Sequence, residues 1–301
     1  MANTFRLKST TMFSRIDDEV NEQPLRVVIL SVEGNKTERQ YFEYVEKYRH
    51  KLGIKATVHI HPLQRAKRDN LSAPEDVLEL LEEYLVIRKK DTLPERLRNV
   101  IPEEYSEEFV IKYLNSKFDS KDERVKEFES ILVEAGYDVV YNNYLKELKG
   151  ENDVFGIVID RDYKSHSVLQ MKKIAEECEK NGYKMYITTP LFEFWLLLHL
   201  IDIHSLSKEE LSCIKINEGV SGRHTYTSKL VSDIAGHSKC ISEKVFQQFY
   251  LPNIDYAISQ AKILNRNISE LIGEDKNEET RMGNIGTNLP ELFDILRENG
   301  I

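Results

Sequence analysis

Two short apolar runs constrain the fold of this chain more than any other feature, and each run ends in an acidic residue. Leu25–Val32 and Val154–Ile159 consist mostly of β-branched and aliphatic residues, which is typical of strands buried on both faces. Glu33 follows the first run and Asp160 follows the second. Segments with helical spacing separate the apolar runs, so the sequence predicts an α/β fold with a parallel sheet flanked by helices.

The acidic residues after these predicted strands are candidate metal ligands. Ligand-binding groups in open parallel sheets gather at the carboxyl ends of the strands, so we expect Glu33, Asp160 and Asp162 at one edge. Asp160 and Asp162 are two residues apart, and on an extended segment they would face the same side. Because clustered carboxylates repel one another, a hard cation such as Mg²⁺ should neutralise them. The pattern favours metal-assisted chemistry on a phosphate ester; in the structural alternative, Arg161 pairs with one of the acids.

Further segments continue the alternation of strands and helices. Thr37 and Gln40 fit a capping box at the start of a helix, and Thr57–Leu63 and Lys184–Thr189 are typical of two more strands. Helical spacing and dense charge between the second and third strands predict a helical insertion, with a scaffold or dimer contact as its structural role. We expect a flexible N-terminal lead at 1–24, core segments at 25–69 and 150–202, a helical insertion at 70–149, and a helical C-terminal region at 203–301.

A fourth acidic residue lies in an otherwise apolar segment. Leu191–Leu200 should form a buried helix, and burying Glu193 within it is costly unless the carboxylate is paired or bound to a metal. The segment follows the strand Lys184–Thr189, so Glu193 is expected at the same edge as the other acids. Functional and structural roles for Glu193 stay equally open.

Three histidines carry weaker signals. His199 is expected to be a core or interface histidine with its polar atoms satisfied. His59 and His61 alternate on a predicted strand and would face one way, which is compatible with a metal pair. No third ligand lies nearby in the sequence, so we expect these two at the surface.

Basic and aromatic residues provide candidate contacts to a nucleic acid. Arg223, His224, Tyr226 and Lys229 follow a glycine-containing loop, and such a cluster could hold a phosphate backbone or a base. An ordinary solvated helix start explains the cluster equally well. Lys36 could contact a phosphate, although a solvated lysine is its default interpretation.

Composition excludes several classes of protein. The 301 residues carry a net charge of −9, which argues against a protein that coats nucleic acid through general basicity but not against a local basic patch or bound metals. Cys178, Cys213 and Cys240 have no metal-binding spacing and are expected to be reduced thiols in the cytoplasm. No run approaches the ~18 apolar residues of a membrane span, and no phosphate-binding or dinucleotide-binding glycine motif is present.

The acidic motifs resemble those of a Toprim domain, the metal-dependent catalytic fold of topoisomerases, primases and OLD-family nucleases. The Toprim hallmark is a Glu after the first strand and a D-x-D pair after a later one, matched here by Glu33 and Asp160–Asp162. More narrowly, the chain resembles the RloB-like (AbiL-type) branch. Its E-G-x-x-T-E-x-x-Y-F and P-x-F-E-x-W-L-L-L-H segments are matched by Glu33–Phe42 and Pro190–His199. The resemblance implies a Toprim-like sheet with a helical insertion.

This resemblance implies an endonuclease that cleaves phosphodiester bonds with Mg²⁺ or Mn²⁺. The residues that would hold the metal are Glu33, Asp160 and Asp162. Glu33 would also serve as a general acid or base, and Glu193 would complete the site. Lys229 and Arg223 would neutralise the phosphate in the transition state.

The resemblance also implies partners. Similar Toprim effectors, such as that of the PARIS antiphage system, are encoded beside an ABC-type or AAA-type ATPase, and the PARIS effector acts on host tRNA. We therefore expect a toxic abortive-infection effector that is controlled by an ATPase and prefers tRNA or other RNA over DNA, and the helical insertion suggests a homodimer. Two alternatives stay open: a non-catalytic regulatory or scaffold subunit of an ATPase complex, and a DNA-processing Toprim enzyme.

Overall fold

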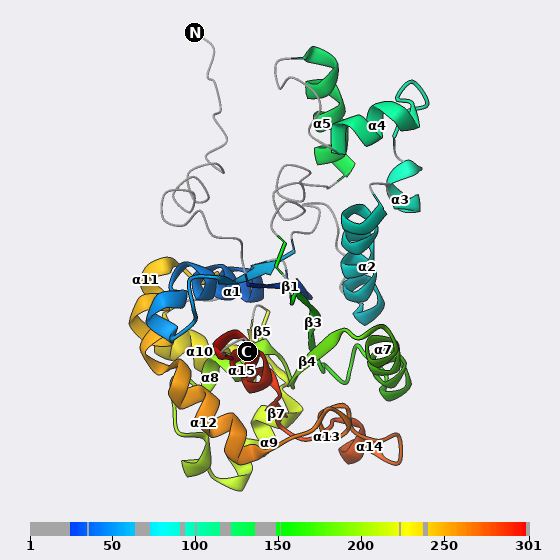
Figure 1. Cartoon of the computed structure of the whole chain (residues 1–301). Helices are drawn as coiled ribbons and strands as arrows, with labels where there is room; N and C mark the ends of the chain where they lie inside the picture. Colours follow the sequence, from blue (N-terminus) through cyan, green and yellow to red (C-terminus); the bar gives the residue numbers. More distant parts are fainter. Residues whose placement is uncertain are drawn as a thin grey trace.

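The computed structural model describes residues 25–34, 36–63, 73–90, 94–99, 101–114, 122–135, 149–150, 152–222, 224–236 and 240–298. Within these residues the chain forms a mixed α/β structure, in which helices flank a five-stranded, mostly parallel sheet (Figure 1). The fold class expected from the sequence is confirmed at this level. No helix in this part of the chain is long and apolar enough to cross a membrane.

The sheet has the strand order β2-β1-β3-β4-β7. Its members are β1 (Arg26–Val32), β2 (Val58–Pro62), β3 (Val154–Asp160), β4 (Lys184–Thr189) and β7 (Gly286–Thr287). β1 pairs in parallel with both β2 and β3, β3 pairs in parallel with β4, and β7 joins β4 antiparallel. Val32 lies opposite Val158, so the carboxyl ends of β1 and β3 finish beside each other.

Both faces of the sheet are apolar because alternate residues of each central strand enter different cores. Val27 and Ile29 of β1 belong to one hydrophobic cluster, whereas Val28 and Leu30 belong to the other. β3 alternates in the same way, with Ile157 on the first face and Val158 on the second. A strand covered on both sides needs a nearly continuous apolar run, which explains why these strands show no alternation of apolar and polar residues in the sequence.

Helices cover each face of this sheet (Figure 1). On one face lie α1 (Thr37–Lys47), α8 (Phe192–Leu197), α10 (Tyr226–Ala235), α12 (Ile254–Leu264) and α15 (Leu289–Arg297). On the other lie α2 (Pro74–Lys90), α7 (Val168–Asn181) and α13 (Ile268–Ile272). α2 lies inside the segment expected as a helical insertion, but it packs against β1 and β3, so it belongs to the layers of the sheet.

The remaining described helices of the insertion are α3 (Glu95–Arg98), α4 (Glu107–Leu114) and α5 (Glu123–Ala135). α4 and α5 form a small hydrophobic core together with Ile87 of α2. Tyr105, Phe109 and Tyr113 gather around the fully buried ring of Phe128. In Figure 1 these helices lie beyond the end of α2 and away from the sheet.

The start of α1 differs from the sequence prediction. Thr37 is the first helical residue, Lys36 occupies the cap position, and no side chain caps the helix. Gln40 instead accepts a hydrogen bond through Oε1 from the backbone N–H of Ile241, at 2.8 Å. The predicted capping box of Thr37 and Gln40 is therefore wrong, because a tertiary contact uses the side chain that would have completed it.

The described part of the C-terminal region is mostly helical, and it also contributes strand β7 to the sheet. Because β7 is only two residues long, the next side chain extends its attachment: Asn288 accepts from Ile187 N and donates to Met185 O. The other described elements are η1 (Arg49–Leu52), η2 (Ile203–Ser205), α9 (Lys208–Ile216), β5 (Gly219–Ser221), β6 (His224–Thr225), α11 (Glu243–Val245), η3 (Phe246–Tyr250), η4 (Leu251–Asn253) and α14 (Glu278–Arg281).

Candidate functional site

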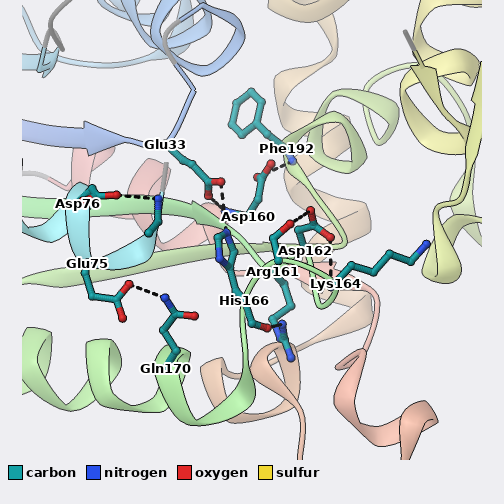
Figure 2. A network of polar contacts seen from close by, with 12 residues as sticks. Glu33, Glu75, Asp76, Asp160, Arg161, Asp162, Lys164, His166, Gln170 and Phe192 are labelled. Atoms are coloured by element: carbon teal, nitrogen blue, oxygen red, sulfur yellow. Dashed lines mark hydrogen bonds and ion pairs between the residues drawn. The ribbon is translucent and has the colours of Figure 1, made fainter. Parts of the chain in front are cut away.

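Glu33 and Asp160 meet where the two central strands end. The N–H of Glu33 donates to Val158 O at 3.1 Å, which extends the pairing of β1 with β3 by one residue. The backbone N–H of Asp160 then donates to Glu33 Oε2 at 2.9 Å. The carboxylate of Glu33 is thus held over the end of β3, beside the side chain of Asp160 (Figure 2).

Asp160 lies between Glu33 and the start of α8. Its Oδ1 accepts a hydrogen bond from the backbone N–H of Phe192 at 2.8 Å (Figure 2). Burial raises the pKa of Asp160 well above its ordinary value, and the charges of Glu33, Glu38 and Glu193 raise it further. The hydrogen bond from Phe192 opposes this rise but does not cancel it.

Glu38 joins this group, although the sequence analysis did not select it as a site residue. It lies in the first turn of α1 and is only 7% exposed. Burial raises its pKa to about 8, with further contributions from the charges of Glu193 and Glu33. A sequence signal for Glu38 existed: it shares the buried helix face of Tyr41, Phe42 and Val45, where a carboxylate is costly without a partner.

Glu193 reaches the group from α8. It is partly exposed, and its charge acts on both Glu38 and Asp160. Four carboxylates from β1, α1, β3 and α8 therefore influence one another at one edge of the sheet. We call Glu33, Glu38, Asp160 and Glu193 the carboxylate cluster.

Polar contacts through His199 link α1, which carries Glu38, to α8, which carries Glu193. The hydroxyl of Tyr41 on α1 lies 3.1 Å from His199 Nε2, and His199 Nδ1 lies 2.9 Å from Trp195 O. Burial lowers the pKa of His199 to about 3, so the ring is neutral and can donate at Nδ1 while accepting at Nε2. The expectation of a satisfied core histidine is confirmed.

The loop after β3 carries a histidine and a buried arginine. His166 Nε2 lies 3.4 Å from Glu33 Oε1. The Arg161 guanidinium donates to the carbonyls of Ile272 and His166, at 2.6 and 2.7 Å, and to that of Arg281. Its hydrogen bonds therefore go to backbone carbonyls rather than to an acid of the cluster, and Arg161 fixes the loop that presents His166.

Asp162 lies in the same loop and points into it. Its Oδ2 accepts from the hydroxyl of Ser165 at 2.9 Å, and its Oδ1 accepts from Lys164 N at 3.3 Å (Figure 2). β3 ends at Asp160, so the chain is no longer an extended strand at Asp162. Two acids at i and i+2 face the same side only on an extended segment. That argument therefore does not apply to Asp160 and Asp162.

The expected basic candidates occupy separate positions. Lys36 is exposed just before α1, and Lys229 is an exposed residue of α10 whose ammonium pairs with Asp233. His224 and Tyr226 are partly buried, and Tyr226 packs against the core. Among the described residues, no hydrogen bond or ion pair joins these four to the carboxylate cluster. Arg223 lies outside the described residues.

A second set of side chains with metal-binding atoms lies at the other end of α1. Glu46, His59 and His61 are buried, and together they could hold a metal ion because one ligand atom of each lies within 4.8 Å of the others. The expectation that His59 and His61 lie at the surface is wrong. The third ligand is close in space because α1 packs on β2, which the local sequence could not indicate. We call Glu46, His59 and His61 the histidine cluster.

The chain belongs to the RloB-like protein family: residues 28–296 match the model of that family. The matched span includes every member of the carboxylate cluster and of the histidine cluster. The comparison with curated proteins found no match, and the comparison with solved structures found none either.

Proposed function

We propose that this protein is a metal-dependent endonuclease with a Toprim-type site, in which the carboxylate cluster binds Mg²⁺ or Mn²⁺. The observation that carries the proposal is the meeting of four carboxylates at one edge of the sheet, where burial first and the charges of the neighbouring carboxylates second raise the pKa values of Asp160 and Glu38. Their oxygen-only donor set fits a hard divalent cation. A bound cation would offset the repulsion among these carboxylates.

The residues of the cluster would have different tasks. Glu33 and Asp160 are each held by a backbone N–H, at 2.9 and 2.8 Å, so they are oriented to act as metal ligands. Glu38 carries its proton at neutral pH in the metal-free protein, and it can release that proton when a cation arrives. His166, with Nε2 3.4 Å from Glu33 Oε1, is placed to hydrogen-bond to this ligand. The metal ion would polarise the phosphate ester and orient it.

The substrate we propose is nucleic acid, with tRNA or other RNA favoured over DNA. This preference rests on the resemblance to Toprim effectors, as do the proposed role in abortive infection, the cytoplasmic location, the partner ATPase and the homodimer. Lys229, His224, Tyr226 and Lys36 are the described candidates for backbone contacts. Lys36 precedes the helix that carries Glu38, and α10 packs against α8, which carries Glu193. Elements next to the cluster thus carry groups that could contact the backbone on either side of the reacting phosphate.

Glu33→Gln tests the proposal because the amide oxygen keeps an acceptor for Asp160 N while the charge is lost. Purified protein should cut total tRNA or plasmid DNA with Mn²⁺ or Mg²⁺ and should stop in EDTA. The variant should retain less than about 1% of the rate. The exposed Glu176→Gln on α7 should behave as the wild type. If the wild type neither cuts either pool nor binds Mn²⁺, the proposal is wrong.

Gly34→Ala should weaken metal binding without removing any carboxylate of the cluster. A Cβ at this position would lie 1.9 Å from Glu38 Oε2, so the carboxylate of Glu38 would have to move. We expect Mn²⁺ affinity to fall by about tenfold or more, as when a group that supports a ligand is lost. Calorimetric titration measures this. Gly219→Ala is the matched control, since its Cβ would meet nothing within 4 Å. Equal affinities in both variants would show that Glu38 does not contribute.

A second candidate function is a non-catalytic subunit. The observation that favours it is the second small core, formed by α4, α5 and Ile87 of α2 away from the sheet, which offers a module for docking a partner. On this view the carboxylate cluster binds a structural cation. Metal-dependent cutting that is lost in Glu33→Gln would decide for the enzyme.

A further inference from the structure

The histidine cluster lies apart from the carboxylate cluster, and the function proposed above does not use it. Glu46 projects from α1, and His59 and His61 project from β2. Their residues are only 6%, 9% and 2% exposed. We propose that these three side chains bind one transition metal ion of the Zn²⁺ class, which fastens α1 to β2.

The geometry of the two elements brings the three side chains together. His59 and His61 are two residues apart on a strand, so they point to the same face, and their rings are nearly parallel at 10°, with centroids 5.9 Å apart. α1 packs on this face and supplies Glu46. In a tetrahedral zinc site the ligand atoms lie about 3.4 Å apart. The observed spread of up to 4.8 Å would therefore close with side-chain movements of about 1 Å.

The donor set selects the class of metal. Two imidazoles and one carboxylate suit Zn²⁺ and its neighbours, whereas Mg²⁺ prefers oxygen ligands only. The two clusters, each of which has one member on α1, would thus differ in metal preference. The carboxylate cluster suits a hard cation, and the histidine cluster suits a borderline one.

The metal-free alternative is a hydrogen-bond network around Glu46. Its Oε1 lies 2.7 Å from His59 Nδ1 and 3.1 Å from Arg49 Nη1, and its Oε2 accepts from Ile60 N at 2.8 Å. Metal binding would replace the bond to His59, while Arg49 and Ile60 would keep the ligating carboxylate oriented, as is usual around metal ligands. The two arrangements differ in whether the protein takes up one equivalent of metal.

Position and burial assign this ion a structural role. Glu46 lies eight residues after Glu38, which is about 12 Å along a helix, so the two clusters do not share an ion. The low exposure of all three ligands limits the access of a substrate to this ion. An ion here would fix α1 against the edge strand, and α1 carries Glu38 at its other end.

A cobalt titration of the full-length protein tests the proposal. Protein stripped with a chelator is titrated with Co²⁺ in excess Mg²⁺, which occupies the carboxylate cluster. We expect one equivalent to bind with the intense visible absorption of four-coordinate Co²⁺ bearing nitrogen ligands, and Zn²⁺ to displace it. His61→Asn should weaken binding by about 100-fold or more. His50→Ala, at an exposed histidine in the turn after α1, should bind as the wild type does.

The proposal is overturned if wild-type protein develops no such absorption, or if folded His61→Asn binds Co²⁺ as tightly as His50→Ala. Circular dichroism checks the fold, and His59→Asn replaces His61→Asn should the latter not fold. Asp160→Asn should leave the cobalt spectrum unchanged. The result is thereby independent of the proposed nuclease, since either site can fail without the other.

Discussion

Asp160→Asn is expected to lower the rate of metal-dependent cleavage by about 1,000-fold or more and to leave the protein folded. The amide oxygen of Asn can still accept from the backbone N–H of Phe192, which is the bond that fixes this side chain. What the variant loses is the negative charge between Glu33, Glu38 and Glu193. A metal ion stabilises the transition state of phosphoryl chemistry by several kcal/mol, and about 4 kcal/mol corresponds to a factor of about 1,000.

Two measurements separate this effect from damage to the fold. The cleavage rate is measured at saturating Mn²⁺, and the melting temperature is measured in EDTA. The melting temperature should stay the same or rise, because one of the repelling charges has gone. Asp294→Asn is the matched control, since Asp294 is an exposed residue of α15 that pairs with Lys262. If Asp160→Asn cuts as fast as Asp294→Asn, Asp160 has no part in binding the metal.

The strands that carry Glu33 and Asp160 could be predicted because buried parallel strands leave an unambiguous signal. Continuous apolar runs located β1 and β3, and the rule that functional groups gather at the carboxyl ends of strands placed Glu33 beside Asp160. β7 left no comparable signal, because two residues have no periodicity. It is held by the side chain of Asn288, a contact that only the folded chain reveals.

Members of both clusters were missed for one physical reason. Glu38 and Glu46 lie on the buried face of α1 together with Tyr41, Phe42 and Val45, and an acid on an apolar helix face signals a compensating partner. The spacing along α1 could indicate that Glu46 needs a partner, but only the packing of α1 on β2 could identify that partner. Asp162 shows the opposite case, in which a rule for extended segments was applied two residues beyond the end of a strand.

Glu38→Gln is expected to make the metal-free protein more stable and the metal-dependent activity lower. The pKa of Glu38 is raised to about 8 in the folded protein, whereas its ordinary value is near 4.5. Between these values the folded state binds a proton that the unfolded state lacks, so the free energy of unfolding falls as pH rises through this window. Gln has no charge to bury. The free energy of unfolding of Glu38→Gln should therefore exceed that of the wild type by an amount that grows from near zero at pH 4.5 to about 2–4 kcal/mol at pH 8.

The acid side of the profile provides an internal control. The pKa values of His61 and His199 are lowered to about 4 and 3 from an ordinary 6.5. The unfolded state therefore binds more protons below pH 6.5, and stability is lost as pH falls. This decline does not involve Glu38 and should be the same in wild type and variant. Thermal melts in EDTA from pH 4 to 9 should show a maximum for the wild type and a flatter alkaline side for Glu38→Gln.

Metal binding should reverse the order of stability of the wild type and Glu38→Gln. Mn²⁺ offsets the repulsion within the carboxylate cluster, so it should stabilise the wild type more than Glu38→Gln, by an amount that grows with its concentration. A site that costs stability when empty and recovers it when a cation binds is typical of selection for function over stability. If Glu38→Gln melts like Glu176→Gln at pH 8 in EDTA, burial and the neighbouring carboxylates do not raise the pKa of Glu38, and the metal site proposed from this cluster loses its support.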